Sequence, residues 1–460
     1  MMSDPADLSI TEARAALDRR ELSAEELTTA CLRRIEERNS SYHAFVHVDA
    51  DRALDAARRA DRDIAAGESR GPLHGIPVGV KDLFDTADMP TTRGSGVFAG
   101  HRPAVDADLV ARLRTGGAVV VGKLDTYEFA MVGPVFDRPA PPARNPWNLQ
   151  RFTGGSSSGS ASAVAGGLVR TALGTDTGGS VRSPSSYCGA VGFKPTYGAL
   201  SLEGVFPLTP SFDHAGILSA SVDEALLTYH ALSDAEPRQV LPPKRDDLRN
   251  VAIGYARDWF AADPQLHPAV LSAMDEAASQ LSLLGAKIVE VALPEAALFE
   301  AAGAVIIHAE AYDIHRTLLA EKGDTYSRKV FQNILSGLLL TPEDVDEARR
   351  ASNRLCAQID AHLDGRFDAL LTVNTLTPAF SFADFETDVA VWTPMRTLAF
   401  NMSGHPVFAL PAGFCDGLPL GLQLIGRRHG EAELGAIARA YEASTDFASL
   451  RPPLPAGVLR

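Results

Sequence analysis

The sequence predicts an α/β fold formed by one large domain. Two short apolar runs, at 74–81 and 118–123, are typical of strands buried on both faces. A strand–helix–strand pattern follows further along, at 250–256, 266–284 and 287–293. Neither a Pro/Gly-rich linker nor an internal repeat of about 20–50 residues divides the chain. We therefore expect a single domain over residues 1–460.

Helices are expected through the N-terminal part, residues 1–70. The pattern over 9–38 predicts two of them, and a capping box of Ser23 and Glu26 opens the second. An Ala-rich pattern with Arg and Asp on its polar face predicts another helix at 51–66.

The segment 71–220 is expected to hold the core of the fold. Its part from 151 to 200 is rich in Gly and Ser, a composition that is usual in flexible linkers. Apolar residues interleave with these glycines, for example over 161–173, so we expect an ordered segment instead. Ordered glycines indicate that the backbone approaches another group closely.

The rest of the chain is expected to form a variable part, 230–400, and a C-terminal part, 401–460. The variable part is mostly helical over 296–363. The C-terminal part is expected to return to the core as two strands and a helix, at 407–410, 418–425 and 431–443.

Charge and hydropathy exclude several classes of protein. The net charge of −15 repels phosphate backbones and no run of Lys or Arg opposes it, so we expect no nucleic-acid partner. No apolar stretch reaches the roughly 18 residues of a membrane span, and no secretory signal is visible. The cysteines Cys31, Cys188, Cys356 and Cys415 are scattered, which disfavours a zinc or redox site. We expect a cytoplasmic protein in which each cysteine is a small buried hydrophobe.

The first candidate catalytic residue is Lys81, which closes the apolar strand at 76–80. Taken alone, it is equally compatible with a lysine that extends its amine toward solvent and with a desolvated lysine that acts as a base. The second role requires a neutral amine. Lowering a lysine pKa by one unit from about 10.4 costs about 1.4 kcal/mol, which burial or nearby positive charge has to supply.

A serine-rich turn, Thr153-Gly-Gly-Ser156-Ser-Ser-Gly-Ser160, precedes a predicted helix. Part of it matches G-x-S-x-G, the nucleophile elbow of α/β-hydrolases, which requires a strand directly before the serine. The preceding residues, 144–152, contain a proline and alternate poorly, so no strand is expected there and the elbow is disfavoured. A phosphate-binding loop is also disfavoured, since no Gly-Lys-Ser/Thr follows.

A second glycine-rich stretch reads Gly174-Thr-Asp-Thr-Gly-Gly-Ser180-Val-Arg182. No large side chain screens the backbone N–H groups around Gly178, Gly179 and Ser180. N–H groups that converge on one oxygen form an oxyanion hole. A turn after a strand would explain the glycines but not the serine that follows them.

Together these motifs resemble the amidase signature family. The similarity is densest over 154–185 and extends to shorter stretches at 75–83, 123–131, 144–147, 192–196, 213–216 and 417–426. It covers most of the chain. The resemblance implies a central mixed β-sheet covered by helices on both faces, and a hydrolase that acts on carbon–nitrogen bonds of linear amides.

The resemblance also implies a Ser–cis-Ser–Lys catalytic triad. Ser180 would be the nucleophile, Ser156 the relay serine in a cis peptide, and Lys81 the base. The oxyanion would be held by the backbone N–H groups of Ser180 and of the three residues before it, Thr177, Gly178 and Gly179. Neither a metal nor an organic cofactor is required.

Other polar residues of the signature are expected to be structural. Arg182 is expected to pair with Asp176 or another buried acid rather than with an anionic substrate. Asp213 and His214 are expected to be architectural, because this chemistry does not need a Ser–His–Asp triad.

The pocket residues are predicted more coarsely. Met131 is expected to line the acyl pocket, and the variable part over 230–400 to shape the leaving-group pocket. The apolar patches at 305–307 and 338–340 are expected to belong to the core.

The expected function is hydrolysis of small aryl or alkyl amides through a Ser180 acyl-enzyme. A carbamate (urethane) or ester hydrolase stays an alternative, because the acyl chemistry is the same. The A subunit of a tRNA-dependent glutamine amidotransferase is a further alternative. Within the family that the chain resembles, such subunits carry a glutamine-binding acid shortly before a C-terminal Asn-x-x-Gly. This sequence has no acid between Val391 and Asn401, which counts against a glutaminase. The expected partner is a small-molecule amide or carbamate; the oligomeric state stays open, with a homodimer as one alternative.

Overall fold

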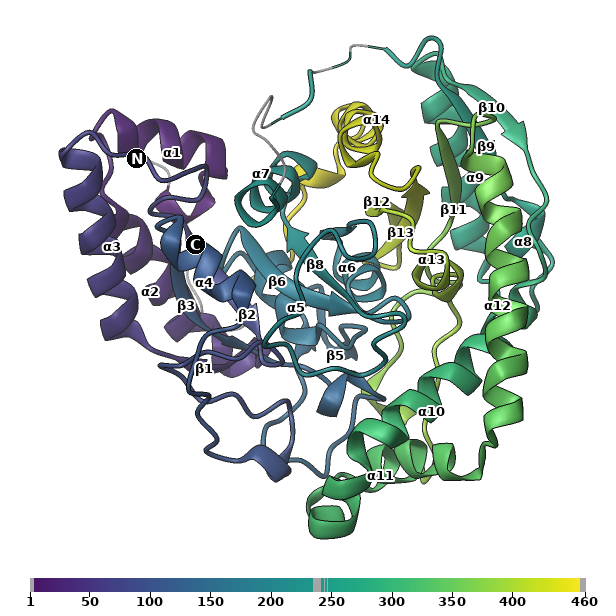
Figure 1. The fold of residues 1–460 in the computed structure, drawn as a ribbon. Helices are drawn as coiled ribbons and strands as arrows, with labels where there is room; N and C mark the ends of the chain where they lie inside the picture. Colours follow the sequence, from purple (N-terminus) through teal and green to yellow (C-terminus); the bar gives the residue numbers. More distant parts are fainter. Residues whose placement is uncertain (1–3, 235–240, 244, 246, 456–460) are drawn as a thin grey trace.

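An 11-stranded mixed sheet organises the part of the chain that the structure describes (Figure 1). The structure is a computed structural model that describes residues 4–234, 241–243, 245 and 247–455. The strand order in the sheet is β1-β3-β2-β6-β8-β7-β12-β13-β11-β9-β10, and β4 and β5 form a separate two-stranded sheet. The strands are β1 (Phe45–Val48), β2 (Pro77–Lys81), β3 (Val119–Leu124), β4 (Arg144–Asn145), β5 (Asn148–Phe152), β6 (Thr171–Asp176), β7 (Val191–Lys194), β8 (His214–Ser219), β9 (Ala252–Tyr255), β10 (Lys287–Glu290), β11 (Ala369–Val373), β12 (Val407–Cys415) and β13 (Leu418–Ile425).

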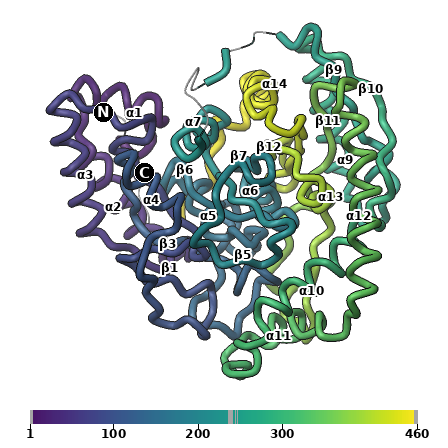
Figure 2. The backbone as a smooth tube through the Cα atoms, in the orientation of Figure 1, coloured from purple at the N-terminus to yellow at the C-terminus, as the bar shows by residue number. Residues whose placement is uncertain are grey.

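Helices surround this sheet. Figure 2 shows α1 to α3 at one side of the molecule, α9 and α12 at the opposite side, and the stretch that contains α5 and α6 between them. The helices are α1 (Ile10–Asp18), α2 (Ala24–Tyr42), α3 (Ala50–Ala65), α4 (Asp108–Thr115), α5 (Ser158–Ala165), α6 (Arg182–Cys188), α7 (Val222–Leu232), α8 (Asp258–Ala261), α9 (Pro268–Leu283), α10 (Ala296–Lys322), α11 (Arg328–Leu335), α12 (Pro342–Leu363), α13 (Leu398–Met402) and α14 (Glu431–Ala443). Across the described residues, no helix combines the length and apolar content that a bilayer crossing demands.

The central strands are buried along their whole length. Every residue of β2, β3, β6 and β8 is buried. Because side chains of a strand alternate between its two faces, such burial requires cover on both. Strand β2 pairs in parallel with β3 and β6, whereas β6 and β8 are antiparallel. The predicted α/β fold with a mixed sheet is confirmed.

Most expected elements lie at or near the expected residues. The capping box of Ser23 and Glu26 opens α2. The strand–helix–strand pattern corresponds to β9, α9 and β10, with β9 and β10 parallel. Helices α10, α11 and α12 fill most of 296–363, and β12, β13 and α14 form the C-terminal return. The division of the chain into four parts stays a prediction, and 1–3, 235–240, 244, 246 and 456–460 lie outside the described residues.

Three expectations were wrong. A strand, β5, does precede the serine-rich turn, although it belongs to the β4–β5 hairpin and not to the main sheet. Leu338 and Leu339 are 57% and 81% exposed, so this patch is not core. Among the four cysteines, Cys415 is only partly buried.

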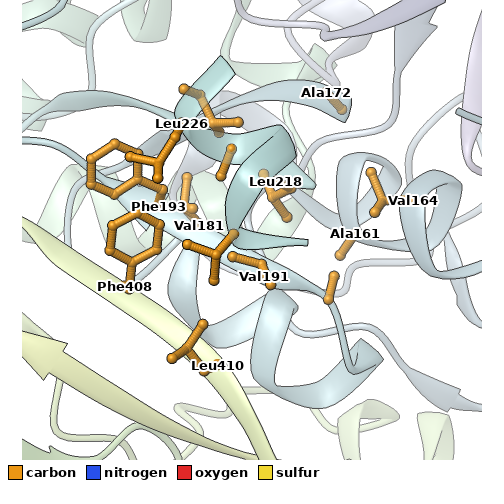
Figure 3. Packing of buried hydrophobic residues seen from close by; sticks show 14 of the residues in the cluster. Ala161, Val164, Ala172, Val181, Val191, Phe193, Leu218, Leu226, Phe408 and Leu410 are labelled. Carbon is orange, nitrogen blue, oxygen red and sulfur yellow. The ribbon is translucent and has the colours of Figure 1, made fainter. Parts of the chain in front are cut away.

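Part of the main core lies where β7 meets β12 (Figure 3). Phe193 and Phe408 are cross-strand partners whose rings stack with centroids 4.1 Å apart and planes 3° from parallel. Both side chains are fully buried. Val181, which directly follows Ser180, is a buried member of the same cluster. The packing of this core therefore supports the turn that carries the candidate nucleophile.

We predict that Phe408→Ala lowers the free energy of unfolding by about 3–5 kcal/mol, because it removes a fully buried ring and leaves a cavity beside Phe193. Urea denaturation of the full chain measures this change. Leu339→Ala is the control, since that side chain is exposed and its loss is expected to change stability by less than about 0.5 kcal/mol. Equal effects of the two substitutions would contradict the prediction.

Candidate active site

Lys81 lies at the C-terminal end of β2, with its side chain fully buried. Its Nζ is 2.8 Å from Ser156 Oγ and 2.7 Å from Thr175 Oγ1. Burial lowers the pKa of Lys81 to about 7, although the charges of Asp176, Asp213 and Asp125 act in the opposite direction. A substantial fraction of this amine is therefore neutral near pH 7, as a general base requires.

The pairing of β2 with β6 brings Lys81 close to the glycine-rich stretch 174–182. Strand β2 runs parallel to β6, with Val80 opposite Leu173, so the C-terminal ends of both strands meet at one edge. Thr175 lies at that end of β6 and accepts a hydrogen bond from the amine. Sequence reasoning missed Thr175 as a site residue; the only signal for it is its place inside the Gly-Thr-Asp-Thr run.

Ser156 lies in the turn between β5 and α5. The peptide bond between Gly155 and Ser156 is cis, so the expected cis serine is confirmed. The Ser156 carbonyl accepts the backbone N–H of Tyr127 at 3.1 Å. A Cβ on Gly155 would lie 2.3 Å from an atom of the Tyr127 ring, so only glycine fits beneath that ring.

Ser180 lies in the turn between β6 and α6. The Asp176 carboxylate stabilises this turn through hydrogen bonds with its backbone. That carboxylate accepts the backbone N–H groups of Gly179 at 2.8 Å and Val181 at 3.0 Å. Gly179 has a φ of 129°, and a Cβ there would lie 2.4 Å from Thr397 Oγ1, so this position requires glycine. The Ser180 carbonyl accepts the N–H of Ser157 at 3.1 Å, which ties the two serine-bearing turns together.

The hydrogen bond from Gly179 to Asp176 reduces the number of N–H groups that are available for the expected oxyanion hole. Because Gly179 donates its N–H to Asp176, that group is engaged and is not free to bind a substrate oxygen. Within the described residues, no hydrogen bond engages the N–H groups of Thr177, Gly178 or Ser180. The assignment of the oxyanion hole to all four N–H groups is therefore reduced to these three. Within the same residues, no hydrogen bond joins the Ser156 and Ser180 hydroxyls, although both residues line one cavity.

Arg182 forms a buried ion pair with Asp176, as the sequence predicts. Its Nε and Nη2 donate to the carboxylate at 3.0 and 2.9 Å, and both side chains are fully buried. Its other donors reach the Thr397 carbonyl and the side-chain oxygens of Gln423 and Asn401. Burial alone would raise the pKa of Asp176, but the Arg182 charge and hydrogen bonds outweigh it and hold that pKa well below its usual value.

Asp213 and His214 make contacts that fit the expected architectural role. Asp213 accepts the backbone N–H groups of Leu208 and Thr209 at 2.9 and 3.0 Å, and the hydroxyl of Thr177. His214 Nδ1 is 2.6 Å from the carbonyl oxygen of Phe212, and burial holds the His214 pKa well below its usual value. Neither side chain lines the cavity at Ser180.

A cavity of about 90 Å³ opens beside Ser156 and Ser180. Met131 lines it, as expected, and so does Ile307, which was expected to be core. No lining residue carries a charged side chain; the residues are Tyr127, Ala130, Met131, Val132, Gly133, Phe152, Gly155, Ser156, Thr177, Gly178, Gly179, Ser180, Ser183, Leu208, Ile307, Val391, Trp392, Thr393 and Met395. The described residues contain no group of three His, Cys, Asp or Glu side chains arranged to hold a metal ion.

The chain is similar to known proteins over most of its length. A family model described as Amidase matches residues 26–434. The glutamyl-tRNA(Gln) amidotransferase A subunit of Chloroflexus aggregans (strain MD-66 / DSM 9485) is 36% identical, over 97% of this chain and 98% of that protein. A crystal structure of an amidase matches with a TM-score of 0.86 and 33% identity, covering 95% of this chain and 99% of that one. The native peptide amidase from Stenotrophomonas maltophilia matches with a TM-score of 0.82 and 30% identity, covering 98% and 99% of the two chains.

We predict that Arg182→Met lowers the free energy of unfolding by about 3–5 kcal/mol, because it leaves the Asp176 carboxylate buried without its counter-charge. Chemical denaturation measures the change. The matched control is Arg428→Met, whose ion pair with Asp360 is partly exposed and is expected to contribute at most about 1 kcal/mol. A structural role for Arg182 is contradicted if the variant keeps parental stability and loses only the hydrolysis of anionic amides.

Proposed function

The chain belongs to the amidase signature family, and we propose that it is a stand-alone hydrolase of small, uncharged aryl or alkyl amides. The observation that carries the proposal is the contact of 2.8 Å between the buried Lys81 amine and Ser156, beside Ser180 in a cavity without charged side chains. An amine with a pKa of about 7 and a neighbouring pair of serines supply a base, a relay and a nucleophile.

Acylation begins with two coupled proton transfers. Ser180 Oγ attacks the substrate carbonyl carbon and gives its proton to Ser156 Oγ, while Ser156 gives its own proton to the neutral amine of Lys81. The tetrahedral intermediate then carries a negative oxygen. The N–H groups of Thr177, Gly178 and Ser180 stabilise it, since donors directed at a developing charge lower the barrier.

The same relay serves the later steps in reverse. The carbon–nitrogen bond breaks as Ser156 protonates the leaving amine and regains a proton from Lys81. Water then attacks the Ser180 ester and gives a proton to Ser156, which passes its own proton to Lys81. When the bond from the carbonyl carbon to Ser180 Oγ breaks, Ser180 takes a proton from Ser156, Ser156 regains one from Lys81, and the carboxylic acid is released. Acylation and deacylation each end with Lys81 neutral again, so the cycle consumes only the amide and water.

The uncharged cavity supports the choice of substrate. Met131, Val132, Ile307 and Trp392 contribute apolar surface, and a charged substrate group placed there would lose hydration without gaining a partner. A carbamate or an ester of similar size meets the same surface and the same nucleophile. Both therefore stay alternatives within this proposal.

A glutaminase within an amidotransferase complex is the second candidate, and the identity of 36% to an amidotransferase A subunit favours it. The segment just before Asn401 argues against it. Val391, Trp392, Thr393 and Met395 from this segment line the cavity, and none of them is acidic. The α-ammonium and α-carboxylate of glutamine would have no opposite charge among the lining residues. A cytoplasmic location stays a prediction, and the oligomeric state stays open with a homodimer as one alternative.

The base has a predicted pH signature. Because Lys81 must be neutral to accept a proton and its pKa is about 7, kcat/KM for an uncharged amide should fall about tenfold per pH unit below that value. Above it, kcat/KM should level off as the amine becomes fully neutral. Initial rates from about pH 5 to 9 measure the profile.

Lys81→Ala should lose at least about 1,000-fold in rate while staying folded, and a variant that retains most activity would overturn the mechanism.

The substrate proposal is tested with matched amides. Pentanamide has the carbon skeleton of glutamine without its two charged groups, and we expect its kcat/KM to exceed that of glutamine by at least about 100-fold, or 2.7 kcal/mol. Nitroanilide, carbamate and ester analogues with the same acyl group rank the leaving groups. Thr393→Asp, which places an acid in the cavity, should reduce this ratio. Glutamine turnover that appears only with added partner subunits would refute the stand-alone amidase.

A further inference from the structure

A second cavity, of about 330 Å³, shares no lining residue with the cavity at Ser180. It involves α3, the start of β3 and the end of α4, whereas Lys81 lies at the C-terminal end of the parallel neighbour β2 (Figure 1). We call it the arginine cavity, since its lining includes Arg52, Arg59, Arg62, Arg70 and Arg114. The proposed amide hydrolysis uses none of these residues.

The side chains that line the arginine cavity include more arginines than aspartates. Three aspartates share the lining with the five arginines: Asp49, Asp63 and Asp88. They engage three of the arginines, since Arg52 lies 3.1 Å from Asp49, Arg70 lies 2.9 Å from Asp63, and Arg114 lies 2.7 Å from Asp88. Arg114 also pairs with Asp106 at 3.0 Å. Among the lining residues alone, the five arginines exceed the three aspartates by two positive charges, while Asp106 beside Arg114 and Glu68 beside Arg70 lie outside the lining.

The excess charge belongs to Arg59 and Arg62. In the part of the chain that the structure describes, neither has a carboxylate partner, and both are exposed residues of α3. Residues three positions apart are neighbours on a helix surface, and like charges so placed repel each other. An anion between them would convert this repulsion into attraction.

The buried side chain of His74 backs the wall of the arginine cavity. Its Nδ1 accepts the backbone N–H of Arg70 at 3.3 Å, and burial lowers its pKa, so the neutral ring carries its proton on Nε2. That Nε2 is fully buried and has no hydrogen-bond partner among the described residues. It is 3.7 Å from Asp63 Oδ2, and a Cβ built on Gly117 would lie 2.9 Å from it. Asp63 and Gly117 line the cavity and His74 does not, so His74 lies behind the wall and faces the carboxylate that engages Arg70.

We infer that the arginine cavity binds a small phosphate-type polyanion. Guanidinium groups bind phosphate oxygens through two parallel hydrogen bonds, and Arg59 and Arg62 have this capacity unused. The volume is sufficient for a small molecule. The long-range field of an acidic protein opposes anion binding, so a saturable interaction has to come from local contacts.

Isothermal titration of the full chain with inorganic pyrophosphate, at constant ionic strength, tests the inference. The parent protein should show saturable binding at one site. The double variant Arg59→Gln/Arg62→Gln should bind at least about tenfold more weakly, because both unpaired guanidinium groups are lost.

The control has the same loss of charge elsewhere on the surface. Arg19→Gln/Arg58→Gln removes two exposed arginines that pair with Glu21 and with Glu25 and Asp55, and neither arginine lines the cavity. It should bind pyrophosphate like the parent. Absence of saturable binding to the parent, equal binding by all three proteins, or equal weakening in both double variants would each overturn the inference.

Discussion

The buried ion pair of Asp176 and Arg182 is the interaction on which the rest of the site depends. The carboxylate accepts the backbone N–H groups of Gly179, Val181 and Arg182, and so determines where Ser180 lies between them. The guanidinium links that turn to distant parts of the chain through Thr397, Gln423 and Asn401. A buried ion pair loses much of its attraction to desolvation and is weak evidence for stability on its own. Here the ion pair fixes the position of the Ser180 turn, because it joins that turn to the C-terminal part of the chain.

Asp176 also affects the base from a distance. Burial favours the neutral form of Lys81, while the negative charges of Asp176, Asp213 and Asp125 favour the ammonium form. The two effects leave a pKa near 7, between a permanently charged lysine and one too weakly basic to take a proton. Under the proposed mechanism, the residues that shape the turn and the charges that adjust the base are partly the same. A change at Asp176 should therefore disturb both geometry and proton transfer.

The sequence was sufficient for the fold class and for the residue types of the site. Continuous apolar runs predicted the buried strands, and the resemblance of the motifs to the amidase signature family implied Lys81, Ser156 and Ser180 as a group. It was insufficient where the outcome depends on which donor meets which acceptor. The N–H of Gly179 was expected in the oxyanion hole, but the Asp176 side chain folds back to accept it. Strand β5 was missed because it lies in a hairpin outside the main sheet, where its first four residues alternate between exposed and half-buried positions and only Phe152 is buried, so it contains no apolar run. Leu338 and Leu339 were misplaced because apolar composition alone does not tell which side of a short helical turn faces solvent.

The separation of charge from the cavity surface is consistent with the proposed chemistry. The ionisable groups near Ser180, namely Lys81, Asp176, Arg182 and Asp213, are all buried behind the lining, while the lining itself has no charged side chain. Under the proposed mechanism, the charges that form are the oxyanion and the Lys81 ammonium. Backbone N–H groups would bind the first, and the hydroxyls of Ser156 and Thr175 already lie within hydrogen-bond distance of the second. Fixed dipoles of this kind need no reorganisation when charge develops, which is the main source of electrostatic catalysis. A substrate that brought its own charge would compete for those dipoles, so the same arrangement that favours the reaction also favours a neutral substrate.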